Sequence, residues 1–259
     1  MIPSAEIIIF GVLVGIVLAS SLTHLFAAIS QEISVFSKKI VCESCGALQP
    51  YSRRIPIIAS LLPARKCSAC GHESPRLYAF LEFALIVFSI WAFSVMRPVL
   101  ALQISVLFFA LIGVTYMDLK KWIIPNEFVV YIIAIGIFGI TADTMNLNNS
   151  LLGLALAAVV SLFIVLPQRF GSGDQTLALG DVKLCLAVAL WLGWILSAYV
   201  FFIASLLAFI TWLFTGIIKG FSAQRRVPFG PFVALSTMIF GIGRVLDPQF
   251  VTHLLTFRF

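Results

Sequence analysis

The amino-acid sequence predicts an all-α membrane protein with about eight transmembrane helices and a small zinc-binding insertion between helices 1 and 2. The prediction rests on composition: 61% of the 259 residues are hydrophobic, only 11% are charged, and the mean hydropathy is +1.09. Soluble domains average about 45–50% apolar and about 25% charged residues. The chain therefore has too little polar surface for a globule in water. It is also too short to add a large soluble domain to several membrane spans.

Each expected helix corresponds to an apolar run close to the roughly 20 residues that a bilayer-spanning helix needs. The first run is too long for the apolar part of a removable signal peptide, and no basic segment precedes it. We expect three parts: a first transmembrane helix (1–30), a cytoplasmic insertion (31–77) and a seven-helix membrane domain (78–259). In chain order the runs lie at residues 5–29, 78–96, 99–117, 124–142, 150–167, 184–199, 200–218 and 229–246.

The basic residues predict the orientation in the membrane. The chain has 17 Lys and Arg residues and 11 Asp and Glu residues. If successive helices cross the membrane in alternating directions, all the Lys and Arg residues except Arg97, Arg244 and Arg258 fall in connections on one side. Short loops rich in Lys and Arg stay in the cytoplasm. We therefore expect this side, with the insertion, to be cytoplasmic and both termini to be outside. Topology accounts for the positive charge, so we expect membrane lipid around the chain and no nucleic-acid partner.

The insertion carries two Cys-x-x-Cys pairs, formed by Cys42 with Cys45 and by Cys67 with Cys70. Four thiolates in this spacing can close a tetrahedral zinc site. The alternative is a pair of disulfides, which rarely persist in the reducing cytoplasm. Because four sulfurs fill the coordination shell, the sequence predicts a structural zinc and not a hydrolytic one.

Two aspartates lie where the expected third and sixth helices meet the cytoplasmic face: Asp118 closes the third helix and Asp181 opens the sixth. Ionisable groups at this depth are costly and tend to be functional. Two carboxylates within hydrogen-bond reach share a proton, so one can act as a general base on water while the other donates to a carbonyl. Gly180 lacks a Cβ beside Asp181, which leaves room for a peptide backbone. The residues alone leave open that each aspartate is only a charge at a helix end.

A set of segments in a fixed order identifies a family resemblance that spans nearly the whole chain. The segments are the cysteine pairs with Arg54-Ile-Pro56 and Ser60-Leu between them, Tyr78-Ala-Phe-Leu-Glu82, Asp118 with Ile124-Pro125-Asn126, Gly180-Asp181-Val-Lys-Leu with Trp191-Leu-Gly-Trp194, and Pro228-Phe-Gly-Pro-Phe232. This set resembles the type IV prepilin peptidases, leader peptidases of which many are also N-methyltransferases.

The resemblance implies an eight-helix intramembrane aspartyl protease of the bacterial inner membrane. Its members cleave type IV prepilins or type II secretion pseudopilins after a glycine, on the cytoplasmic side. Asp118 and Asp181 match the two catalytic aspartates of the family. Many members then methylate the new amino terminus with S-adenosylmethionine, an activity attributed to the insertion.

Two further residues belong to the expected site. Glu82 matches a family segment and could meet the methyl donor or a substrate amine, the alternative being a solvated or paired charge near a helix end. Lys183 is expected to anchor its helix at the cytoplasmic face, the alternative being an effect on the acidity of an aspartate.

The chain also departs from the family pattern. The family's Gly-x-Gly-Asp reads Ala178-Leu-Gly-Asp181 here, while a literal Gly171-Ser-Gly-Asp174 lies upstream. We assign the role to Asp181, because Val-Lys-Leu and Trp191-Leu-Gly-Trp194 follow it at the family's offsets. Arg54 and Ser20 stand where Asn is common, which weakens the methyltransferase inference more than the protease one. Two alternatives therefore stand: a peptidase without methylation, and a zinc-stabilised transporter or scaffold whose aspartates line an ion path.

Overall fold

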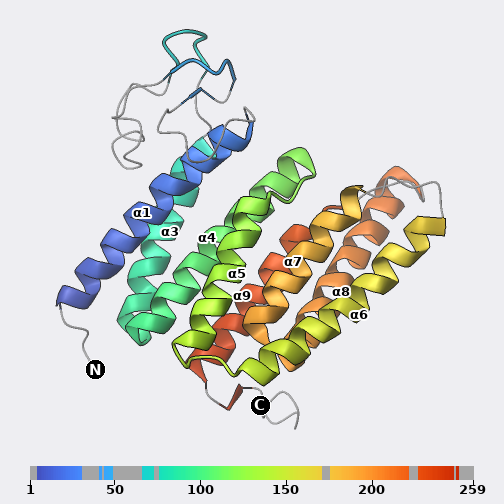
Figure 1. Ribbon diagram of the computed structural model, residues 1–259. Helices are drawn as coiled ribbons and strands as arrows, with labels where there is room; N and C mark the ends of the chain where they lie inside the picture. The colour runs from blue at the N-terminus through green and yellow to red at the C-terminus, as the bar shows by residue number, and fades with distance from the viewer. Residues whose placement is uncertain are drawn as a thin grey trace. The chain divides into compact units, whose positions relative to one another are not determined.

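The computed structural model describes residues 5–30, 41–42, 44–48, 66–72, 76–170, 176–221, 227–247 and 249–250, and this part of the chain is helical apart from turns and one isolated β-bridge. The predicted all-α fold, with eight helices and a cysteine-containing insertion after the first, is confirmed. In chain order the helices are α1 (Ala5–Ser30), α3 (Arg76–Val95), α4 (Pro98–Lys121), α5 (Asn126–Thr141), α6 (Leu147–Phe170), α7 (Thr176–Leu192), α8 (Trp194–Lys219) and α9 (Gly230–Leu246), as Figure 1 shows.

The lengths of these helices fit a bilayer. Helices α1, α3, α4 and α8 are each long and apolar enough to cross a membrane, and α5, α9 and the described part of α6 are shorter apolar helices. With this composition the chain is a membrane protein, as predicted.

The sixth and seventh helices end and begin at different residues from those predicted. The sequence predicted a boundary near residue 200, but α7 ends at Leu192 and α8 begins at Trp194. Gly193 between them has φ 77° and ψ 179°, a backbone conformation open essentially only to glycine. Because apolar residues continue on both sides, a search for apolar runs does not detect this break. At its other end, α7 begins at Thr176, so Asp181 lies in the second turn of this helix and does not open it.

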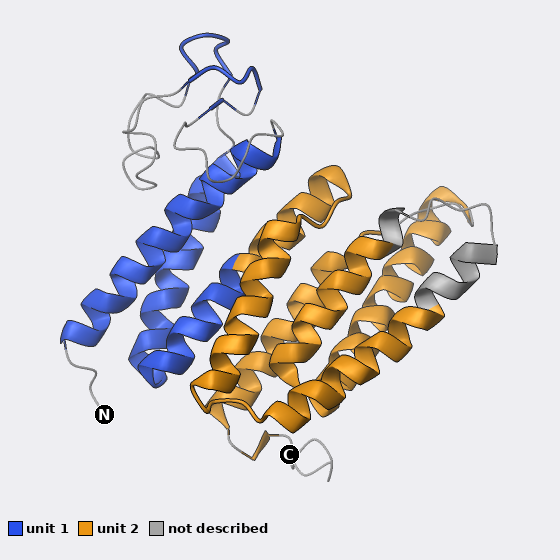
Figure 2. Cartoon of the chain, viewed as in Figure 1, with its two compact units in different colours: residues 1–109 blue, residues 110–259 orange. Residues whose placement is uncertain are grey.

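The chain divides into two compact units, residues 1–109 and residues 110–259 (Figure 2). These units are defined by packing. The predicted division into residues 1–30, 31–77 and 78–259 is defined by function, and it stays a prediction.

In the first unit, α1 and α3 pack closely against each other (Figure 1). Two glycines four residues apart on α1 make this possible. A Cβ on Gly15 would lie 2.8 Å from the Cα of Ile86, and a Cβ on Gly11 would lie 3.0 Å from the Cβ of Phe93. Small residues at this spacing let transmembrane helices approach backbone to backbone. The α1–α3 pair is therefore held by close van der Waals packing.

In the second unit, α7 is the central helix and packs against α5, α6, α8 and α9. Its end is held by Arg244 of α9, whose Nη1 donates hydrogen bonds to the carbonyls of Trp191 and Leu192 at 3.0 and 3.2 Å. Carbonyls in the last turn of a helix lack partners within the helix, and a cation there also interacts favourably with the helix dipole. Helix α7, which carries Asp181, is thus fixed by neighbours along its length and by a cation at its end.

Candidate active site and metal centre

Asp118 lies in the last turn of α4 and is 6% exposed. Its Oδ2 accepts a hydrogen bond of 2.8 Å from the backbone N–H of Gly230, the first residue of α9. A buried charge is costly unless it is paired or hydrogen-bonded. This bond therefore stabilises the carboxylate, and it joins the end of α4 to the beginning of α9.

Asp181 lies half-buried in the second turn of α7, within electrostatic range of Asp118. Both aspartates that the sequence paired thus lie in the second unit, and their joint catalytic role stays a prediction. Their surroundings differ, because the Asp181 carboxyl has no hydrogen-bond partner among the residues that the structure describes. One turn further along α7, Cys185 is 1% exposed and belongs to the core of the second unit.

Gly180 and Lys183, on either side of Asp181, lie against the α4–α5 connection and the first residue of α5, respectively. A Cβ on Gly180 would lie 3.3 Å from the Cβ of Ile124, so the missing side chain lets this segment approach α7 closely. Lys183 is exposed, and its Nζ donates a hydrogen bond of 3.1 Å to the Oδ1 of Asn126. Sequence reasoning did not predict this role for Asn126, although it lies in a segment that carries the family resemblance.

Trp122, directly after α4, has a strained backbone. Its φ is 59°, in the left-handed region, and its N–H donates a hydrogen bond of 3.0 Å to the carbonyl of Asp118. A bulky residue rarely adopts this conformation, which costs about 1–2 kcal/mol. The residue therefore ends α4 sharply, four positions after Asp118, and sets the direction in which the α4–α5 segment leaves.

Glu82 lies in the first unit, in the second turn of α3, and is 7% exposed. The Thr23 side chain of α1 lies near its carboxyl group, and the Thr23 hydroxyl donates a hydrogen bond of 3.3 Å to the carbonyl of Ser20. One turn earlier, Tyr78 packs its ring against Phe26 of α1, with centroids 5.3 Å apart. Glu82 is thus a buried group on the face that α3 presents to α1. Its role towards a methyl donor or a substrate amine stays a prediction.

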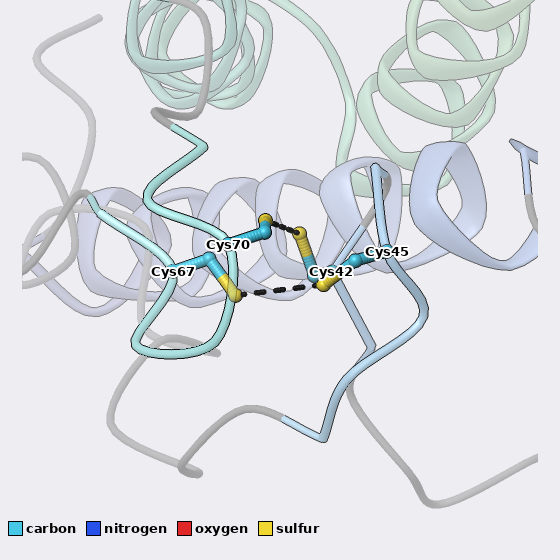
Figure 3. Close-up of side chains that lie close together, drawn as sticks. All are labelled: Cys42, Cys45, Cys67 and Cys70. Atoms are coloured by element: carbon cyan, nitrogen blue, oxygen red, sulfur yellow. Dashed lines mark hydrogen bonds between the residues drawn. The ribbon is translucent and has the colours of Figure 1, made fainter.

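Four cysteines converge on one point in the insertion between α1 and α3 (Figure 3). The sulfurs of Cys42, Cys45, Cys67 and Cys70 all lie within 4.8 Å of one another. The Cys42–Cys70 and Cys45–Cys67 sulfurs are each 3.8 Å apart. Tetrahedral zinc with Zn–S bonds of about 2.3 Å places its sulfurs about 3.8 Å apart, whereas a disulfide bond is about 2.05 Å long. The four free thiols therefore have the spacing of a zinc site.

The two cysteine pairs adopt the same turn. The N–H of Gly46 donates to the carbonyl of Cys42 at 2.9 Å, and the N–H of Gly71 donates to the carbonyl of Cys67 at 2.8 Å. Both glycines have φ 71°, which a side chain would disfavour. The backbone N–H of Cys70 lowers the pKa of the Cys67 thiol to about 6. This favours the thiolate, which is the form that ligates metals.

The fold and the cysteine centre define a polytopic helical membrane protein whose insertion has the cysteine spacing of a metal site, and comparison with known proteins places it further. The type IV leader peptidase family model matches residues 105–213, and the bacterial peptidase A24 N-terminal domain model matches residues 13–96. Together these two matches show that the chain is similar to the type IV leader peptidase family.

Individual relatives agree with these matches. A prepilin leader peptidase/N-methyltransferase of Legionella pneumophila is 26% identical over 80% of this chain and 73% of its own length. The protein of the same name from Dichelobacter nodosus is 29% identical over 77% of this chain and 70% of its own length. The one from Vibrio cholerae is 24% identical over 78% of this chain and 80% of its own length. No solved structure matches the chain.

The sulfur spacing predicts that the purified protein carries about one zinc ion per chain. Cys42→Ser or Cys67→Ser should lower the zinc content measured by mass spectrometry of the metal, because each removes one of four ligands. Cys185→Ser is the matched control and should keep the metal, since this cysteine lies in α7, outside the cluster. Undiminished zinc in a variant that lacks all four clustered cysteines would contradict the assignment.

Proposed function

We propose that the chain is a prepilin peptidase, a membrane-embedded aspartyl endopeptidase. It removes the basic leader of type IV prepilins or type II secretion pseudopilins at the cytoplasmic face of the bacterial inner membrane. The observation that carries the proposal is the placement of Asp118 in the last turn of α4 and of Asp181 in the second turn of α7, within range of each other's charge in one compact unit. The match to the leader peptidase family model and the names of the relatives support the substrate class.

The position of the pair near helix ends suits this substrate. Asp118 lies in the last turn of α4 and Asp181 in the second turn of α7, close to the basic residues Lys120, Lys121 and Lys183. Basic residues mark the cytoplasmic ends of transmembrane helices. A prepilin leader stays in the cytoplasm while its apolar helix lies in the bilayer, so the bond to be cut reaches the depth of the aspartates. Water has access at the same depth.

The chemistry needs one ionised and one protonated carboxyl group. The ionised group accepts a proton from water, whose oxygen attacks the scissile carbonyl, and the protonated group donates to the carbonyl oxygen. When the C–N bond breaks, the first group returns its proton to the leaving amine. The second recovers a proton from a hydroxyl of the intermediate, and both groups are restored.

Zinc in this proposal is structural. The four cysteines hold it and leave no open coordination position for water. Its contribution is to fold an insertion whose described residues bury little apolar surface of their own. The zinc loop is cytoplasmic, since the basic residues on its side of the helices exceed those on the other side.

Methylation of the new amino terminus, with S-adenosylmethionine as methyl donor, is the second half of the proposed activity. The relatives are named for both activities. Of the two departures from the family pattern, Ser20 lies half-buried in α1 and Arg54 lies outside the described residues. These departures favour the alternative of a peptidase that does not methylate.

The carboxylate pair predicts that Asp118→Asn and Asp181→Asn each lower prepilin cleavage by at least about 10²–10⁴-fold, the usual contribution of a general acid or base. The double variant should be no worse than either single one, because the two groups act as a unit. Cleavage would be measured in membranes that contain equal amounts of each variant.

Asp174→Asn is the matched control, since this aspartate follows the literal Gly-Ser-Gly and lies outside the described residues. It should retain most activity. An active Asp181→Asn together with an inactive Asp174→Asn would show that the active-site motif had been assigned to the wrong aspartate.

Methylation is tested on the product itself. With S-adenosylmethionine present, the mass of the mature pilin should exceed that of the unmodified chain by one methyl group. Variants of the insertion should still cleave but should lose the methyl group. A wild-type product that never carries the methyl group would establish the peptidase-only alternative.

A further inference from the structure

The first turn of α9 has an unusual arrangement of backbone donors. A helix begins with N–H groups that have no partner within the helix. Here the N-cap is Phe229, which makes no side-chain cap, and Pro231 at the second position has no N–H. The N–H groups of Phe232 and Val233 both donate to the carbonyl of Phe229, at 3.1 and 3.2 Å. The N–H of Gly230, in contrast, donates to another helix: its acceptor is the Oδ2 of Asp118 in α4.

Space, and not backbone conformation, requires glycine at position 230. Its φ lies outside the left-handed region, so any residue could adopt it. A Cβ there would lie 2.8 Å from the Oδ2 of Asp118 and 3.2 Å from the Cγ1 of Val114. The first distance is shorter than a Cβ tolerates. A side chain at this position would therefore displace the carboxylate or separate the N–H from it.

A hydrogen bond from an N–H favours the ionised form of a carboxyl group, and the beginning of a helix adds a partial positive charge. Asp118 has this donor. Asp181 has no such donor among the described residues, and it lies within range of the negative charge of Asp118. When two neighbouring carboxyl groups share one proton, the proton belongs on the group whose ionised form is stabilised less.

We propose that Gly230 is a positioning residue that divides the roles of the two aspartates: its N–H holds Asp118 ionised as the base towards water and leaves the proton on Asp181, the acid. This inference rests on the proposed peptidase activity. During attack, the water oxygen bonds to the scissile carbon, the water proton passes to Asp118 and the Asp181 proton passes to the carbonyl oxygen. During collapse, the C–N bond breaks as Asp118 protonates the amine, and Asp181 takes a proton from a hydroxyl.

The test compares two Gly→Ala variants of the same helix. Gly230→Ala should lower kcat for prepilin cleavage by at least about tenfold, since loss of a positioned N–H donor typically costs about 10²–10³-fold. KM should stay within about twofold, because the substrate-binding surface is intact. Gly243→Ala is the control: its added Cβ meets the ring of Phe250, which is the end of a flexible side chain. Its kcat and KM should match those of the wild type.

A double variant separates the two contacts at position 230. Val114→Ala removes the neighbour at 3.2 Å but leaves the Oδ2 of Asp118 at 2.8 Å. Gly230→Ala with Val114→Ala should therefore stay as slow as Gly230→Ala alone. Recovery of wild-type kcat in the double variant would show that position 230 acts only through packing and would overturn the proposal.

Replacement of Gly230 by glycolic acid in cell-free synthesis covers the case in which Gly230→Ala does not fold. The resulting ester removes the N–H and adds no side chain. We expect the same loss of kcat, and wild-type kcat in the ester would overturn the proposal. An active Asp118→Asn would instead refute the catalytic role of Asp118, and with it the proposed aspartyl mechanism. An inactive Asp118→Asn together with fully active Gly230 variants would refute the division of roles alone.

Discussion

The hydrogen bond from the Gly230 N–H to the Asp118 carboxylate is the interaction on which the proposed active site depends. Inside a bilayer, polar groups must find partners within the protein. The carboxylate in the last turn of α4 and the N–H in the first turn of α9 provide partners for each other at 2.8 Å. The same bond that makes a buried charge tolerable also brings together the two helix ends that surround it.

The second carboxylate is placed by a different means. Asp181 depends on the packing of α7, whose neighbours are α5, α6, α8 and α9. Close to Asp181, Gly180 admits Ile124 and Lys183 holds Asn126, while Arg244 fixes the last turn of the same helix. A carboxyl group held by its helix, with no hydrogen-bond donor of its own among the described residues, is suited to carry a proton. The site is therefore asymmetric, with one aspartate held by a hydrogen bond and the other by its helix.

Local patterns in the sequence predicted what local chemistry determines. The Cys-x-x-Cys spacing predicted the sulfur cluster, because each pair forms its own turn, and apolar runs predicted the number of helices. The boundary between α7 and α8 was predicted wrongly, since a single Gly193 breaks an uninterrupted apolar stretch. The contacts of Gly230 and Asn126 could not be predicted, because they depend on which helices become neighbours. Both residues lie within segments that carry the family resemblance, and this was the one indication in the sequence that they belong to the site.

The central claim is that the side chains at positions 118 and 181 face each other, and cysteine cross-linking tests it most directly. In a Cys185→Ala background, Asp118→Cys with Asp181→Cys would be oxidised mildly in membranes, and the linked peptides would be identified by mass spectrometry. The control pair is Asp118→Cys with Leu179→Cys, since Leu179 is 50% exposed two residues before Asp181. We expect a 118–181 cross-link that forms at least about tenfold faster than the 118–179 cross-link. Equal rates, or no 118–181 cross-link in a folded protein that retains its zinc, would contradict the paired site.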